Sequence, residues 1–129
     1  MINPDSVGRT FHGADQVIVT QSEIDAFAAV IGEGDTSVAP PTFSIRISLP
    51  QYESILTQPE IGVDWSRLVH GDQKFENYRP IVAGDVFTCS ATIETLRTVA
   101  GNEIVSVRSD LHSGSELVVS SWSTLVVRG

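Results

Sequence analysis

Cysteine and lysine are nearly absent from the sequence, and long apolar runs are missing altogether. The 129 residues include one cysteine, Cys89, and one lysine, Lys74. A lone cysteine excludes an internal disulfide and a thiolate metal site, so we expect Cys89 to be a small buried side chain in a strand. No apolar run approaches the roughly 20 residues that a membrane-spanning helix needs, and the N-terminus lacks the basic and apolar segments of a secretory signal. These absences favour a cytoplasmic protein.

Positive charge is scarce as well. Eight Lys and Arg residues stand against 16 Asp and Glu residues, which gives a formal net charge of −8. Because the phosphates of nucleic acids and the surfaces of anionic membranes are negative, the sequence predicts neither of them as a partner. The three histidines, His12, His70 and His112, are scattered without the spacing of metal ligands, so no metal site is expected.

The composition is that of an ordinary globular chain. Hydrophobic residues make up 41% of the sequence and charged residues 19%, which is not the balance of a disordered protein. The length suits one domain with one core, and no repeat, low-complexity tract or linker divides it. We therefore expect a single domain over residues 1–129.

Two helices are predicted in the first half of the chain. Thr20 can begin a helix with a capping box, and Gly32 can end it. A second helix is expected from about Pro41 or Thr42, where a proline is tolerated in the first turn. Its apolar residues lie on more than one side, which is typical of a buried helix, and Pro50 should kink or break it.

The second half of the chain predicts four strands. They are expected over residues 68–79, 86–97, 104–111 and 117–127. Gly101-Asn102 and Ser113-Gly114 are turn signals between the last three strands. Helices that come early and strands that come late define an α+β chain, and an antiparallel sheet with one very apolar helix wraps around that helix. This layout predicts a single hotdog fold, in which an antiparallel sheet surrounds a central apolar helix.

Several segments of the chain have more specific sequences. They are Val7–Phe11, Val19–Ala28, Ala39–Phe43, His70–Phe75 and Arg79–Asp85. In order and spacing they resemble the MaoC-like (R)-specific hydratase and dehydratase family, in particular its N-terminal MaoC dehydratase type. The last segment is similar to one in small (3R)-hydroxyacyl-ACP dehydratase subunits. The resemblance covers nearly the whole chain and is carried by the segments together rather than by a single motif.

The resemblance implies an activity on acyl thioesters. In the family, a (3R)-3-hydroxyacyl thioester of CoA or of an acyl carrier protein is reversibly dehydrated to a trans-2-enoyl thioester, in fatty-acyl or related metabolism. An Asp and a His a few residues later transfer the protons, and backbone amides at a helix start polarise the thioester carbonyl. No cofactor is implied. Hotdog domains pair edge to edge, so we expect a homodimer or a heterodimer with a second MaoC-like subunit.

The chain departs from the family pattern at the catalytic pair. Asp35 stands where the family Asp is expected, but Pro40 stands where the His should follow, and the loop between them is short. Asp35 is therefore a candidate catalytic carboxylate, or else an ordinary loop Asp after a helix end. His70 is the second catalytic candidate, as a base that replaces the missing histidine, or else a strand-end histidine with a structural hydrogen bond.

The same segments supply candidate substrate-binding residues. These are Pro41, Thr42, Phe43 and Gly71. The helix expected near residues 42–49 would form the floor of an acyl tunnel and point its N-terminal amides at the thioester carbonyl. Arg79 either meets a phosphopantetheine phosphate or forms a surface ion pair.

Three functions stay open at this point. The chain can be a dehydratase subunit that uses Asp35 or His70, or the non-catalytic, substrate-holding subunit of a heterodimer, which the missing histidine favours. A different class is a non-enzymatic hotdog dimer that binds an acyl chain or another apolar ligand. Thioester hydrolysis ranks low, because the only acid near the central helix, Glu53, lies beyond Pro50.

Overall fold

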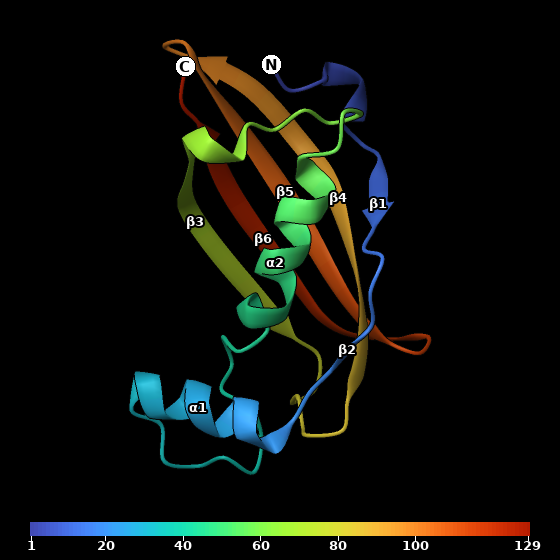
Figure 1. The fold of residues 1–129 in the computed structure, drawn as a ribbon, viewed down its shortest axis with the longest axis vertical. Helices are drawn as coiled ribbons and strands as arrows, with labels where there is room; N and C mark the ends of the chain where they lie inside the picture. Colours follow the sequence, from blue (N-terminus) through green and yellow to red (C-terminus); the bar gives the residue numbers. More distant parts are fainter.

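An antiparallel sheet with one helix lying across it forms the body of the protein (Figure 1). The computed structural model describes residues 1–129. The helices are α1 (Gln21–Ile31) and α2 (Ile45–Leu56), with short 3-10 helices at Pro4–Ser6 and Trp65–Arg67. The strands are β1 (Thr10–His12), β2 (Val17–Ile18), β3 (Leu68–Asn77), β4 (Val86–Val99), β5 (Asn102–Ser113) and β6 (Glu116–Val127). This arrangement confirms the α+β hotdog fold, and the four long strands lie where the sequence predicts them.

The sheet presents two different faces. Its strand order is β1-β4-β5-β6-β3, with β2 also pairing with β4, and every pairing is antiparallel. Alternate residues of each strand point toward α2, and we call this side the helix face. On it, Ala91, Val107 and Leu125 are buried in one cluster with α2 side chains. The opposite side, the open face, carries residues such as Arg108 and Trp122, which pair across β5 and β6.

Helix α1 lies beyond one end of the sheet (Figure 1). It begins as predicted, because the Thr20 side chain accepts a hydrogen bond from the Glu23 amide, and it ends at Gly32 with a left-handed φ of 77°. The ring of Phe27 meets the ring of Phe43 edge-on, with centroids 5.5 Å apart. This contact fixes α1 to the segment that leads into α2. Neither helix is long and apolar enough to cross a membrane.

Helix α2 begins later than the sequence predicts. The expected start at Pro41 or Thr42 is wrong, because residues 41–44 form turns. In these turns the Phe43 amide donates to the Pro40 carbonyl oxygen at 2.9 Å. The two prolines therefore shape a loop at the head of α2 rather than its first helical turn.

Pro50 lies inside α2 and does not end it. The helix continues to Leu56, contrary to the prediction of a kink or break. A proline cannot donate to the carbonyl four residues earlier, that of Arg46, but both residues are exposed, so water can serve that carbonyl. The buried residues of α2 are Ile47, Ser48, Tyr52, Ile55 and Leu56. They occupy one side of the helix, so the prediction of buried apolar residues on several sides is also wrong.

The turn between β4 and β5 lies one position earlier than predicted. Ala100 and Gly101, with φ values of 51° and 81°, connect the paired residues Val99 and Asn102. Positive φ at both central positions defines a type I′ turn, whose twist suits a tight hairpin. A residue with a Cβ atom pays about 1–2 kcal/mol for that conformation, so Ala100 is strained.

Replacing Ala100 with glycine is expected to stabilise the protein by about 0.5–1 kcal/mol. The relief of left-handed strain exceeds the extra entropy that glycine gives to the unfolded chain. The free energy of unfolding in urea measures the effect. Gly101→Ala is the matched control and should lose about 1 kcal/mol for the same reason. A less stable Ala100→Gly chain would contradict the assignment of strain to this turn.

Candidate active site

A cleft opens where the loop before α2 meets the end of β3. It has a volume of about 340 Å³ and is lined by residues 38–41 and 77–81. The Asn77 side chain donates to the Pro41 carbonyl oxygen at 3.0 Å and so fixes one wall to the other. No histidine lines the cleft. Its walls combine proline and aliphatic side chains with the polar side chains of Asn77, Tyr78 and Arg79, which suits a ligand that is apolar with a polar end.

Asp35 lies beside this cleft in the loop after α1. Its carboxylate accepts hydrogen bonds from the Ser37 amide at 3.0 Å and the Ser37 hydroxyl at 2.7 Å. These bonds, that from the hydroxyl first, hold the pKa of Asp35 below its ordinary value. Asp35 lines a smaller hollow of about 140 Å³, which shares residues 38–41 with the cleft. The structure thus places an ionised, exposed carboxylate next to the cleft.

His70 lies at the opposite end of β3 from the cleft. Its Nε2 atom is 3.1 Å from the Asp72 carbonyl oxygen and 2.9 Å from Gln73 Oε1. Both are acceptors, so Nε2 carries a proton and Nδ1 is the atom left to exchange one. Six ladder steps separate His70 from Asn77, or about 20 Å along the strand. Within one chain, therefore, the fold does not bring His70 to Asp35.

The four candidate substrate-binding residues have different surroundings. Pro41 lines the cleft, and Thr42 is exposed in the turn that follows it. The Phe43 side chain is fully buried against α1, so it supports the cleft loop from inside. Gly71 sits far from the cleft at an irregularity of β3, where a Cβ atom would lie 3.3 Å from the Thr124 carbonyl oxygen.

The head of α2 offers fewer free amides than expected. The amides of residues 45–47 already donate to the carbonyls of residues 42–44, at 3.0–3.2 Å. The amides of Thr42 and Ser44 have no such acceptor, but Ser44 is buried. The Thr42 amide, next to the cleft, is the one donor of this turn that remains open to a ligand.

Arg79 forms the ion pair that was one of its two expected roles. Its guanidinium donates from Nη1 and Nη2 to the two oxygens of Asp85, at 2.9 and 3.0 Å, and from Nε to Glu116 at 3.2 Å. The hydrogen bond to Asp85 raises the pKa of Arg79 most strongly, against the opposing effect of burial. Most N–H donors of Arg79 are thus engaged, and the side chain fixes this wall of the cleft to Asp85 and Glu116.

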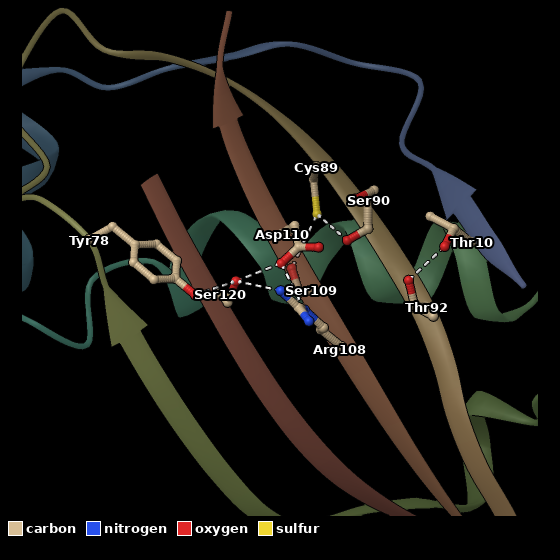
Figure 2. A network of polar contacts seen from close by, with 9 residues as sticks. All are labelled: Thr10, Tyr78, Cys89, Ser90, Thr92, Arg108, Ser109, Asp110 and Ser120. Atoms are coloured by element: carbon tan, nitrogen blue, oxygen red, sulfur yellow. Dashed lines mark hydrogen bonds and ion pairs between the residues drawn. The ribbon is translucent and has the colours of Figure 1, made fainter. Parts of the chain in front are cut away.

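A second polar network supports the cleft from the open face (Figure 2). The Tyr78 hydroxyl points at Ser120, 3.4 Å away, and the Ser120 hydroxyl donates to Asp110 at 2.7 Å. Arg108 donates to Asp110 at 3.1 Å and lies 5.4 Å from the centre of the Trp122 ring. This network of contacts fixes the side chain of Tyr78, a cleft residue, to β5 and β6.

Polar side chains are also buried under α2. The Tyr52 hydroxyl is 3.3 Å from that of Ser123, which also bonds to Gln73. Burial raises the pKa of Tyr52. Three buried polar atoms have no partner, namely the hydroxyl oxygens of Ser44 and Ser48 and Nε2 of Gln73. The side chains packed beneath α2 are thus partly polar.

Sequence reasoning missed Asn77, Tyr78 and the buried polar row. Asn77 and Tyr78 stand directly before the Arg79–Asp85 segment, and their position at a strand end is the signal that could have marked them.

Cys89, by contrast, is buried in β4 as predicted. Its sulfur is 3.5 Å from the Ser109 hydroxyl, and burial raises the pKa of the thiol, so it is not a reactive thiolate.

The fold, an antiparallel sheet with one helix lying across it, defines a hotdog protein. The family model for the FAS1-like, dehydratase domain region matches residues 5–119, and the chain belongs to that family. A UPF0336 protein of Thermobifida fusca is 39% identical over 144 residues, covering 99% of this chain and 95% of the relative. One of Streptomyces griseus is 37% identical over 138 residues, covering 95% and 92%.

Solved structures agree with this fold. A C-terminally truncated HadBC (3R-hydroxyacyl-ACP dehydratase) complex from Mycobacterium tuberculosis matches with a TM-score of 0.83 at 22% identity, covering 95% of this chain and 97% of the other. A MaoC-like dehydratase from Rhodospirillum rubrum matches with a TM-score of 0.73 at 19% identity, covering 99% and 97%. The MaoC-like resemblance is therefore confirmed at the level of fold and family.

Proposed function

We propose that the chain is a subunit of a (3R)-hydroxyacyl-thioester dehydratase that also hydrates the trans-2-enoyl thioester. Its substrate is an acyl-CoA or acyl-carrier-protein thioester. The observation that carries the proposal is the ionised carboxylate of Asp35 beside the cleft at the head of α2. The apolar walls suit the acyl part near C2 and C3, and the free Thr42 amide suits the thioester carbonyl oxygen.

In the hydration direction, Asp35 and a second, acidic group each transfer one proton. Asp35 accepts a proton from water, the water oxygen forms its bond to C3, and C2 takes a proton from a second group. An ionised carboxylate can serve the first transfer but not the second. The cleft holds no histidine for the second transfer, so we infer that the acid comes from outside this chain's own cleft.

A neighbouring hotdog subunit is the proposed source of that group. The lack of a histidine after Asp35 supports this, because Pro40 stands where the family pattern expects one. The outer edge of β3 is free to pair with such a subunit. The match to a complex of HadB and HadC type supports the same arrangement.

Hydration of a trans-2-enoyl-CoA by the purified chain tests the proposal. Loss of enoyl absorbance gives the rate, and Asp35→Asn is expected to lower it by about 100-fold or more. Asp15→Asn, another exposed Asp, is the matched control and should keep the native rate. Full activity in Asp35→Asn would overturn the role of Asp35. Thioester binding without turnover by the native chain would replace the enzymatic function with a holding or binding one.

A further inference from the structure

The segment that carries Asp35 turns back along α1. Figure 1 shows the chain reversing after the end of α1 and running beside the helix before it rises toward α2. The Glu33 amide donates to a carbonyl oxygen of α1 at 2.8 Å, and the Ala39 amide donates to the Ile81 carbonyl oxygen at 2.7 Å. Between these two bonds lie residues 34–38, which we call the Asp35 segment. Every one of its residues is exposed or half-buried.

One hydrogen bond ties the Asp35 segment to another element. Within the segment, Asp35 bonds to Ser37, and two backbone amides donate to the adjacent Glu33 side chain. These contacts are local, so they do not fix the segment against the rest of the protein. The Thr36 carbonyl oxygen, by contrast, accepts a hydrogen bond at 2.8 Å from Nε2 of Gln21, 15 positions earlier in the sequence. The position of the segment between its two ends therefore depends on Gln21.

The Gln21 side chain is itself oriented by α1. Gln21 is the first residue of the helix, and its Nε2 also donates to Oδ1 of Asp25, one turn later, at 3.0 Å. Residues four apart on a helix lie side by side, which suits this pair. Both partners of the side-chain amide are acceptors, so its nitrogen and not its oxygen must face them. Asp25 thereby holds one N–H of Gln21, and the other N–H is directed at Thr36.

A carboxylate on a segment of this kind needs an anchor before it can serve as a base. Fixing the backbone of one residue costs about 1–2 kcal/mol, and an exposed segment buries little surface that could offset this cost. Segments with few buried contacts open locally. A displacement of about 1 Å at a reacting group can lower a rate about 100-fold. The hydrogen bond from Gln21 limits such displacement of Asp35.

We propose that Gln21 is a positioning residue for Asp35. Its side-chain N–H holds the Thr36 carbonyl oxygen and thereby sets where the Asp35 carboxylate lies beside the cleft. Gln21 does not line the cleft, so it acts through the segment and not on a ligand. The effect of Gln21 on hydration rests on the proposed function, whereas its hold on the Asp35 segment does not.

Amide order parameters from NMR relaxation test the hold on the segment without any assay of activity. Gln21→Met removes the donor but keeps the length and the helix propensity of the side chain. The order parameters of residues 35–37 should fall from about 0.85 in the native chain to below about 0.6. Gln16→Met, at an exposed glutamine outside α1, is the matched control and should leave them unchanged. Native order parameters in Gln21→Met would overturn the proposal, whether or not the chain hydrates enoyl thioesters.

Steady-state kinetics of enoyl-CoA hydration test the effect on Asp35. Gln21→Met should lower kcat about tenfold or more and leave KM within about twofold, because Gln21 does not contact the substrate. Gln21→Lys keeps a donor on a side chain of similar length, so it should restore kcat to within about threefold of native. A native kcat in Gln21→Met alongside a loss in Asp35→Asn, or no recovery in Gln21→Lys, would overturn the positioning role. Full activity in Asp35→Asn would instead overturn the proposed function, and the order parameters would still decide whether Gln21 holds the segment.

Discussion

Replacing Phe43 with alanine is expected to lower the free energy of unfolding by about 3–5 kcal/mol. The side chain is 0% exposed, packs in the core cluster that joins α1 to the sheet, and meets Phe27 edge-on. Truncation removes this burial and leaves a cavity that the neighbouring side chains fill only in part. Because Phe43 also supports the cleft loop from inside, thioester binding should weaken together with stability. Chemical denaturation measures the loss.

Two further variants serve as controls for the loss of stability in Phe43→Ala. Phe43→Leu keeps most of the volume and should lose less than about 1.5 kcal/mol. Val30→Ala, on the same α1 but 87% exposed, should stay within about 0.5 kcal/mol of the native chain. If Phe43→Ala cost no more than Val30→Ala, the ring would not be the link between α1 and the sheet.

Replacing Arg79 with methionine is expected to remove about 2–3 kcal/mol of stability at pH 7. The side chains of Arg79 and Asp85 are 29% and 12% exposed, and they meet at 2.9 Å. Methionine keeps the apolar stem of Arg79 but leaves a largely buried carboxylate without its cation. Asp85 also accepts from the Val82 amide at 2.9 Å, so the turn behind the cleft should loosen as well.

The size of this loss depends on pH. Burial of Asp85 acts to raise its pKa, but hydrogen bonds from Arg79 and the Val82 amide outweigh burial, so the pKa lies below its ordinary 3.8. A carboxyl with a depressed folded pKa adds stability above its unfolded pKa and loses it as pH falls through the folded value. The difference between the native chain and Arg79→Met should therefore be full at pH 7 and shrink below about pH 4.

Arg97→Met is the matched control for this pH dependence. Arg97 is an exposed arginine of β4 and lies in no ion pair of the structure. Its replacement should change stability by less than about 0.5 kcal/mol, with no dependence on pH in this range. A loss in Arg79→Met that stayed constant down to pH 3 would show that packing, and not the Asp85 pair, is what Arg79 contributes.

The parts of the fold that local rules decide could be predicted from sequence. The cap at Thr20 and the end of α1 at Gly32 depend on hydrogen bonds within one turn, and the long strands follow from alternation along each segment. The break expected at Pro50 failed because solvent on the exposed side of α2 can serve the carbonyl that the proline leaves free. Which sides of a helix become buried depends on the elements that pack against it, and the sequence of the helix alone does not specify those contacts.

The candidate site, like the fold, could be predicted from the sequence only in part. The sequence marked Asp35 by its position after α1 and marked the proline loop that became one wall of the cleft. It could not supply the other wall, because Asn77 meets Pro41 across 36 residues. The sequence also placed His70 at a strand end, but it could not show that Asp35 lies beside the opposite end of that strand.

Complementation between two inactive chains is the most direct measurement of whether the site is shared. Asp35→Asn removes the proposed base, and His70→Ala removes the histidine that cannot reach Asp35 within one chain but can approach it only from a neighbouring copy. Each variant alone is expected to be nearly inactive in enoyl-CoA hydration. If the site joins Asp35 of one subunit to His70 of the other, an equal mixture forms heterodimers with one intact site, and about one quarter of the native activity returns. A mixture that stays as inactive as its components would show that no site is formed between two copies of this chain.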